Sequence, residues 1–338
     1  MIAVAAAVAA SHRHELTDAS GLLAQIHGPR LAVAVIFEAA SLVFLASLQQ
    51  WLLKTGGARL RLGPMTAIVV AANAMAAALP GGTAFSLAWT FRQLHRRGVR
   101  QALAAAVLVA AGALSLLGML LLLLAGAVTA TPSGPAAALR TAVLVLAALL
   151  AAAGLTAAGM TRMPWLRRTA RRALGRAGSR WRPVQRFQDA LRGIVHQARS
   201  VQAGLAGWVR PFALALLNWA CDAAALAAVL WALGIGVPWH NLLLVYGLTQ
   251  ISISLRLTPG SLGIVEASLT ALLVASGLPS GQALAATLLY RVLSFWLLQP
   301  IGWASWLGLT LHNSPVPAHT AARHTARPDP DDPKPPDT

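Results

Sequence analysis

Five long apolar segments constrain this chain more than any other feature of its sequence. Each has about 20 residues or more with hardly any charge, which is the length that a helix needs to cross the hydrocarbon core of a bilayer. Across the chain 57% of residues are apolar and 11% are charged, against about 25% charged in an ordinary soluble domain. The sequence therefore predicts an all-α, polytopic membrane protein. The predicted spans are residues 31–53, 102–128, 136–160, 211–233 and 282–311.

Two shorter apolar regions are each interrupted by a Pro-Gly pair, in LPGGTAF at 79–85 and in LTPGSLGIVE at 257–266. Proline removes a backbone donor and glycine relaxes the backbone, so each pair breaks a helix that would run through it. In lipid, such a break is tolerated only where protein or a watery cavity surrounds it. Paired breaks in two halves of a chain are typical of a transporter's binding site. The candidate turn residues are Pro80, Gly81, Gly82, Pro259, Gly260, Ser261 and Gly263.

The distribution of basic residues predicts the topology of these segments. The chain carries a net charge of +17, and its basic residues gather in loops at 54–61, 92–100 and 162–199, which marks those loops as cytoplasmic. Two of them flank the first Pro-Gly segment, so a hairpin that enters and leaves from the cytoplasm keeps both inside. Uncharged loops flank the second segment, so its hairpin should enter from the opposite face. We therefore expect two inverted-topology halves, each with a Pro-Gly-interrupted re-entrant hairpin.

Several other classes of protein are disfavoured. The basic charge lies in short loops between spans and no RNA-reading motif accompanies it, which argues against a nucleic-acid partner. The single cysteine, Cys221, excludes an internal disulfide and a cysteine metal cage. The sequence also lacks a phosphate-binding glycine-rich loop before a lysine, a nucleophile elbow and a histidine pair on one helical face. We therefore expect no enzyme activity, no cofactor and no metal.

The chain divides into a membrane domain at 1–311 and a tail at 312–338. The first ten residues resemble the end of a spanning helix that begins upstream. Residues 162–207 form a basic segment with apolar residues at helical spacing, which indicates either an amphipathic helix on the cytoplasmic membrane surface or a solvated loop. The tail is rich in proline and aspartate, so we expect it to be disordered and cytoplasmic.

Three acids, Glu38, Asp222 and Glu266, lie at membrane depth. A charge there costs about 2.5–3.5 kcal/mol on insertion scales, so such residues are usually functional. They would bind a cationic headgroup or take up a coupling proton. A buried ion pair, or a protonated acid that only joins helices, is the alternative. Arg256 and Arg291 are the matching cations. Either could pair with Glu266 or hold a lipid phosphate, because a guanidinium binds phosphate in a bidentate fork.

The second arm of each hairpin begins with a helix N-terminus. Thr83 and Ser261 are good N-cap residues, and the free N–H groups of a helix that starts near the middle of the membrane favour an anion. Close helix packing at the glycines is the alternative. Glu266, seven residues after the proline, should lie two turns into its arm on the side where the arm starts. Asn218, on the same predicted span as Asp222, is a further polar candidate.

These segments resemble a known family. LTPGSLGIVEASL followed by GLPSGQALAATLLYRVLSFW is similar to the C-terminal signature of the lysylphosphatidylglycerol synthase transmembrane-region family, which is roughly P-G-G-x-G-x-x-E and then a Tyr-Arg in the next helix. NAMAAALPGGTAFSLAWTFRQLHRRGV is similar to the motif of its N-terminal half, with Asn73, the Pro-Gly-Gly and an aromatic residue before Arg92. Ser261 stands where the family has its second glycine. The resemblance covers about residues 1–311 and adds Asn73, Arg92 and Tyr290 to the candidate site.

The resemblance implies a flippase-like membrane domain. The soluble aminoacyl-transferring domain that gives the family its name does not follow the membrane part, so we expect a protein that moves a phospholipid or lipid-linked headgroup between leaflets, not a synthase. The alternative is a non-transporting scaffold for a separately encoded lipid-modifying enzyme. The expected partners are membrane phospholipids, with anionic lipid at 162–199. The expected location is a bacterial-type plasma membrane, with several spans and a cytoplasmic C-terminus.

Overall fold

The regular structure of the described residues is entirely helical, which confirms the all-α prediction. The computed structural model describes residues 27–78, 81–131, 137–145, 148, 205–255 and 259–311. The elements are α3 (Gly28–Thr55), α4 (Leu62–Ala78), α5 (Gly82–Arg96), α6 (Gln101–Thr129), α10 (Leu205–Ala232), α11 (Trp239–Leu255), η1 (Pro259–Ser261), α12 (Ile264–Ala275), α13 (Ser280–Arg291), η2 (Val292–Trp296) and α14 (Leu298–Leu311).

Four stretches are long and apolar enough to cross a membrane: Gly28–Thr55, Gln101–Thr129, Gly207–Ala232 and Ser280–Leu311. They match four of the five predicted spans as long apolar stretches of helix, with ends that differ by a few residues. The fifth, at 136–160, falls largely outside the described residues. The N-terminal run, most of the basic segment and the tail also lie outside the described residues, so the structure does not test the predictions for them.

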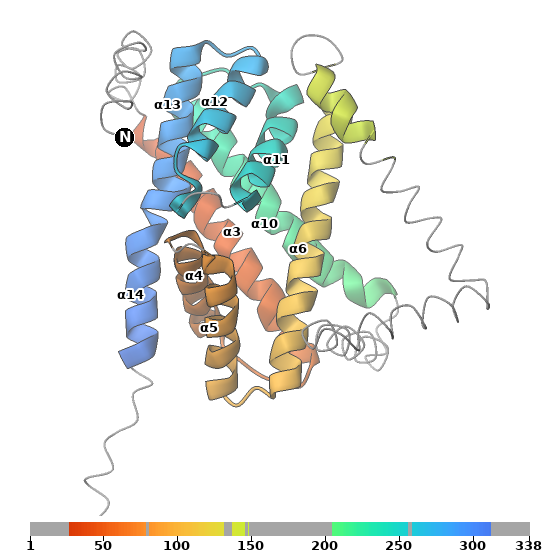
Figure 1. Ribbon diagram of the computed structural model, residues 1–338, viewed down its shortest axis with the longest axis vertical. Coiled ribbons are helices and arrows are strands. Elements are labelled where there is room, and N and C mark those ends of the chain that lie inside the picture. The colour runs from red at the N-terminus through yellow and green to blue at the C-terminus, as the bar shows by residue number, and fades with distance from the viewer. Residues whose placement is uncertain are drawn as a thin grey trace, which may run out of the picture.

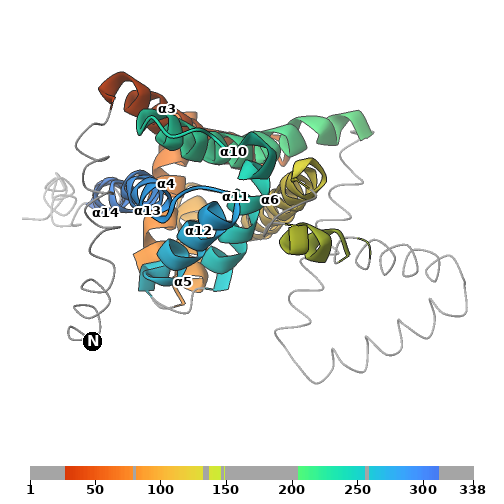
Figure 2. The same ribbon diagram turned by 90° about the horizontal axis from the view of Figure 1, so that it is seen from above.

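Helices α3 and α10 form the most extensive contact in the structure. Around this pair, α4 packs on α14 and α3, while α11 packs on α6. Figure 1 shows the α4–α5 pair in the lower half of the molecule and the α11–α12 pair in the upper half. Seen from above, α3 and α10 lie along one side, and α12 and α5 lie toward the other (Figure 2). The turn η1 contacts α4, so the inner ends of the two pairs meet near the middle.

The paired helices are too short to cross a bilayer. Helices α4 and α11 have 17 residues each, α5 has 15 and α12 has 12. At a rise of about 1.5 Å per residue they extend about 18 to 26 Å, whereas a hydrocarbon core is about 30 Å thick. Each pair also packs on itself, α4 on α5 and α11 on α12.

Glycines set the closest contacts between helices. A Cβ atom at Gly126 of α6 would lie 2.5 Å from the backbone nitrogen of Leu244 in α11. A Cβ at Gly302 of α14 would collide with Ala74 of α4. Helix association in membranes depends on such close approaches, because apolar side chains gain no burial from water there.

The last span is not the single regular helix that the sequence predicts. Between α13 and α14 the chain makes the π turn η2, in which the Leu297 N–H donates to the Val292 carbonyl at 2.8 Å. Pro300 follows four residues after Trp296. In a regular helix the Pro300 ring would clash with the Trp296 carbonyl, and Pro300 has no N–H to donate to it. The wider π turn lies just before this proline, and such turns are frequent at functional sites.

Candidate functional site

A polar cavity of about 370 Å³ lies where the inner ends of the helix pairs meet. The last turns of α4, the turn η1 and the π turn η2 all contribute to its wall, together with α3, α10 and α11. It brings together predicted residues from widely separated segments of the sequence. Its polar and charged lining residues are Glu38, Ser41, Asn73, Ser115, Asn218, Asp222, Gln250, Ser261, Tyr290, Arg291, Ser294 and Gln299.

Asp222 is the most heavily hydrogen-bonded group in this wall. Its Oδ2 accepts from the Tyr246 hydroxyl at 2.7 Å and from Gln250 Nε2 at 3.3 Å, and its Oδ1 accepts from the Tyr290 hydroxyl at 2.6 Å. The Glu38 carboxyl lies within hydrogen-bonding reach of the Asp222 carboxyl. Four helices, α3, α10, α11 and α13, therefore bring two acids and three donors to one point.

Glu38 has one oxygen to spare. Its Oε2 atom is inaccessible to solvent and has no hydrogen-bond partner among the described residues. Buried polar atoms without a partner are uncommon in native structures and call for a physical explanation. The Glu38–Asp222 pair, as we call these two acids, is therefore saturated on the Asp222 side and unsaturated on the Glu38 side.

Asn218 fastens α10 to α3 beside the acids. In the amide orientation that satisfies both neighbours, its side-chain nitrogen donates to the Ser41 carbonyl at 2.9 Å. Asn73, on α4, donates to the Val69 carbonyl of its own helix at 3.1 Å and also lines the cavity. Both predicted asparagines thus reach the cavity, one as an inter-helix tie and one as a lining group.

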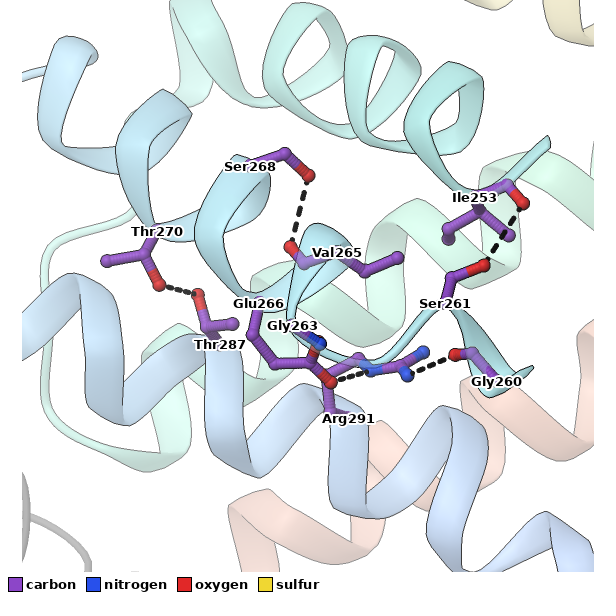
Figure 3. Close-up of polar contacts among 10 residues, drawn as sticks. All are labelled: Ile253, Gly260, Ser261, Gly263, Val265, Glu266, Ser268, Thr270, Thr287 and Arg291. Carbon is purple, nitrogen blue, oxygen red and sulfur yellow. Dashed lines mark hydrogen bonds and ion pairs between the residues drawn. The ribbon is translucent and has the colours of Figure 1, made fainter. Parts of the chain in front are cut away.

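Arg291 forms an ion pair with Glu266, which answers one question that the sequence left open. Its Nε donates to Glu266 Oε1 at 2.8 Å and its Nη2 to the Gly260 carbonyl at 2.9 Å (Figure 3). Its guanidinium lies 4.5 Å from the centre of the Phe295 ring. The other Glu266 oxygen accepts the Gly263 N–H at 2.7 Å. Arg291 is 5% exposed. We call Arg291, Glu266, Gly260, Gly263 and Phe295 the latch, because their contacts tie η1 and α12 to α13.

The predicted N-caps are wrong. Helix α5 is capped at Gly81 and α12 at Gly263, not at Thr83 and Ser261. Both glycines have positive φ, 66° and 81°, which residues with a Cβ adopt at a cost. Because the turn continues to Gly263, α12 starts later than predicted. Glu266 therefore lies in the first turn of its helix, where it caps the Gly263 N–H, and not two turns in.

Ser261 instead closes the tip of the second pair. It takes the left-handed conformation at φ 51°, and its hydroxyl donates to the Ile253 carbonyl at 3.4 Å (Figure 3). That hydrogen bond ties the turn η1 to the last residues of α11. Ser261 is buried and lines the cavity, so its hydroxyl serves the wall and not the start of α12.

The remaining candidates lie elsewhere. Arg92 is exposed on α5 and does not line the cavity. Gly82 is buried, and a Cβ there would lie 2.5 Å from the Met75 carbonyl oxygen, so this glycine serves the close packing of α5 on α4. Pro80 and Arg256 fall outside the described residues.

Sequence reasoning missed Tyr246, Gln250 and Gln299. Tyr246 and Gln250 stand four residues apart, which places them on one face of α11. Two polar groups at that spacing in an apolar helix are a signal that the prediction did not use. Gln299 directly precedes Pro300 in the last span, and no local pattern marks its turn toward the cavity.

The latch depends on a glycine at position 260. Gly260 has φ 68°, and a Cβ there would lie 2.6 Å from the tip of the Phe295 ring. Gly81 has nearly the same backbone at φ 66°, with no atom within 4 Å of its Cβ position. We expect Gly81→Ala to cost about 1 kcal/mol of stability, for backbone strain alone. Gly260→Ala should cost about 1–3 kcal/mol more, for overpacking.

Unfolding of both alanine variants in detergent measures the difference. Because the two glycines share a conformation, the excess at position 260 reports the clash with Phe295. Measured in a Phe295→Leu background, the cost of Gly260→Ala should fall toward that of Gly81→Ala, whereas the cost of Gly81→Ala should not change. Equal losses at the two positions would contradict the close contact.

The fold and site define a helical, multi-pass membrane protein with a polar cavity at the junction of two interrupted helix pairs. The family model for the lysylphosphatidylglycerol synthase TM region matches residues 1–302, so the chain belongs to that family. It is also similar to a UPF0104 membrane protein from Methanothermobacter thermautotrophicus, with 27% identity over 118 residues. That match spans 35% of this chain and 35% of the relative. The resemblance read from the sequence is therefore confirmed.

Proposed function

We propose that this protein moves the headgroup of a phospholipid or lipid-linked molecule between the two leaflets. The observation that carries the proposal is the polar cavity with its two acids and one arginine, enclosed by membrane-spanning helices. Charged side chains at membrane depth are costly and usually mark substrate or ion pathways. Translocation breaks no covalent bond, so the proposal includes no catalytic residue.

An apolar groove beside the cavity supports a substrate with both a polar and an apolar part. The groove has a volume of about 1150 Å³ and is lined by apolar residues of α3, α6, α10 and α11. All four of these helices also line the polar cavity. Phe37 of the groove precedes Glu38 of the cavity, and Ala220 and Ala223 of the groove flank Asp222. A lipid whose headgroup occupied the cavity could lay a chain along this wall.

The order of the helices supports an inverted repeat. One half reads as α3, the α4–α5 hairpin and α6. The other reads as α10, the α11–α12 hairpin and the α13–α14 span. Each hairpin packs on the last span of the other half, α4 on α14 and α11 on α6, and α3 packs on α10 at the centre. The hairpins occupy opposite ends of the molecule in Figure 1. Such repeats allow a central site to face each side in turn.

Charge supports an orientation with the α4–α5 end in the cytoplasm. The loops at that end carry Lys54, Arg59, Arg61, Arg97 and Arg100, whereas the loops at 233–238 and 276–279 carry no charged residue. Short loops rich in lysine and arginine stay on the cytoplasmic side. Helix α14 ends at the lower end of Figure 1, the same end as the loop between α5 and α6. We therefore infer a plasma-membrane protein whose chain leaves α14 on the cytoplasmic side.

Cysteine labelling tests this orientation. Thr55, at the end of α3, and His240, at the start of α11, are both exposed. In a chain with Cys221→Ala, we expect Thr55→Cys to react with an impermeant thiol reagent only after the cell membrane is opened. His240→Cys should react in intact cells. Reaction of both from one side would contradict the inverted arrangement.

Reconstitution tests the function. Purified protein in vesicles with tail-labelled phospholipids and an impermeant quencher should speed exchange between leaflets. Glu38→Gln should lower the rate about tenfold, equivalent to about 1.4 kcal/mol of barrier. Arg92→Gln, outside the cavity, should leave the rate unchanged. Absence of exchange for every lipid in a panel would overturn the proposal and favour a scaffold for a lipid-modifying enzyme.

A further inference from the structure

The Glu38–Asp222 pair has a property that headgroup binding alone does not explain. Two carboxyl groups from different spanning helices lie within hydrogen-bonding reach of each other beside the cavity. We propose that this pair binds one exchangeable proton and is the proton-binding site of the protein. The proton site itself does not depend on lipid movement. Its coupling to headgroup movement rests on the function proposed above.

The proximity of the two acids favours a proton on the pair. Two neighbouring carboxylates repel each other, and a proton on one of them removes that repulsion. A cation could neutralise them instead. Arg291 directly follows Tyr290, which donates to Asp222, but its guanidinium already binds other groups. Arg291 of α13 gives its Nε to Glu266 and its Nη2 to Gly260. Within the described residues no salt bridge joins a cation to Glu38 or Asp222.

The hydrogen bonds assign different roles to the two acids. Asp222 accepts from Tyr246, Gln250 and Tyr290, and hydrogen bonds of this kind favour the charged form of a carboxylate. Glu38 has no such donor, and its Oε2 lacks any partner among the described residues. Asp222 is thus the fixed, charged acceptor. Glu38 is the group that carries the proton, donates it to Asp222 and can exchange it through the cavity.

The surrounding groups make a metal ion a poor occupant. The tyrosine hydroxyls and the Gln250 amide direct hydrogen atoms at Asp222, which uses the lone pairs that a metal would need. In the described part of the chain no three His, Cys, Asp or Glu side chains are grouped to hold a metal. The titratable or charged groups that surround the pair are Tyr246 on α11, Tyr290 and Arg291 on α13, and Cys221 on α10.

Infrared difference spectroscopy on the purified full-length protein tests the proposal. A protonated carboxyl has a C=O stretch that a carboxylate lacks, so raising the pH should remove one such band. Glu38→Gln keeps the shape of the side chain and its N–H can still donate to Asp222, so the band should disappear while the fold survives. Asp189→Asn, which removes an acid from the basic segment at 162–199, should leave the band unchanged.

A second variant keeps the test decisive if Glu38→Gln does not fold. Tyr290→Phe leaves both carboxyls in place but removes one donor that stabilises the charged Asp222. Release of the proton then becomes harder, so the midpoint of the titration should move to higher pH. No band in the folded wild type, or an unchanged midpoint in Tyr290→Phe, would overturn the proposal. Loss of the band on adding sodium or potassium at constant pH would show a cation site and overturn it equally.

The vesicle assay then tests the coupling. Wild-type exchange should change with pH around the midpoint seen by infrared, whereas the residual rate of Glu38→Gln should not depend on pH. A pH-dependent rate in Glu38→Gln would contradict the coupling and leave the proton site standing. If no lipid is exchanged at any pH, the proposed function fails, and the infrared titration still decides the proton site by itself.

Discussion

Replacing Arg291 with methionine is expected to destabilise the protein by about 3–5 kcal/mol, the usual cost of removing one partner from a buried ion pair. The Arg291 side chain is 6% exposed and that of Glu266 is 20% exposed, so we expect the lower part of this range. The substitution leaves the Glu266 carboxylate with the Gly263 N–H alone, and it frees the Gly260 carbonyl. Unfolding in detergent measures the loss. Arg92→Met, which removes an exposed arginine from α5, should change stability by less than about 0.5 kcal/mol.

The double variant Glu266→Gln/Arg291→Met separates the latch from substrate binding. Both charges are absent in it, so no charge is stranded, and the loss should be smaller than the sum of the two single losses by about 0.5–3 kcal/mol. Methionine also retains a favourable contact with the Phe295 ring. If Arg291 only holds the turn, lipid exchange should recover together with stability. Recovered folding without exchange would show that Arg291 also contacts the headgroup.

The cost of burying charge made the centre of the site predictable from the sequence. Glu38, Asp222 and Glu266 stand out in the sequence because a charge at membrane depth is costly, and in the structure each of them lies beside another ionisable side chain. The partners themselves were not predictable. Which cation meets Glu266, and which hydroxyls meet Asp222, depends on how spans far apart in sequence pack together, and no local pattern encodes that packing.

For the two turns, the sequence predicted the position of each helix break but not the residue at which the next helix begins. The two Pro-Gly segments correctly located the breaks, because proline and glycine act on the backbone where they stand. The helix starts were misplaced, because N-cap preferences describe a residue with extended backbone. Here α5 and α12 each begin after a glycine with positive φ, Gly81 and Gly263. The π turn before Pro300 was missed for a similar reason. A proline in an apolar helix predicts that the helix is disturbed there, but not which backbone conformation results.

The second large effect is expected at Gly126, where α6 and α11 cross. A Cβ there would lie 2.5 Å from the Leu244 nitrogen and 2.6 Å from the Leu243 carbonyl carbon. These are backbone atoms of a helix and cannot rotate away, so a larger side chain must push α11 off α6. We expect Gly126→Leu to cost at least the 1–3 kcal/mol typical of overpacking and to abolish folding in many detergents. Gly126→Ala should produce a smaller loss of the same sign.

Gly112 supplies the matched control on the same helix. It is exposed, and no atom lies within 4 Å of its Cβ position. Replacing a glycine inside a helix gains about 0.5–1 kcal/mol through backbone entropy, so Gly112→Leu should be neutral or stabilising. The same gain applies at Gly126, so the measured net loss there is a lower bound on the cost of the clash.

Displacing α11 would also move Tyr246 and Gln250 away from Asp222 and weaken their hydrogen bonds. A folded Gly126→Ala protein should therefore titrate its Glu38–Asp222 proton at higher pH, whereas an unchanged titration would show that α11 keeps its place.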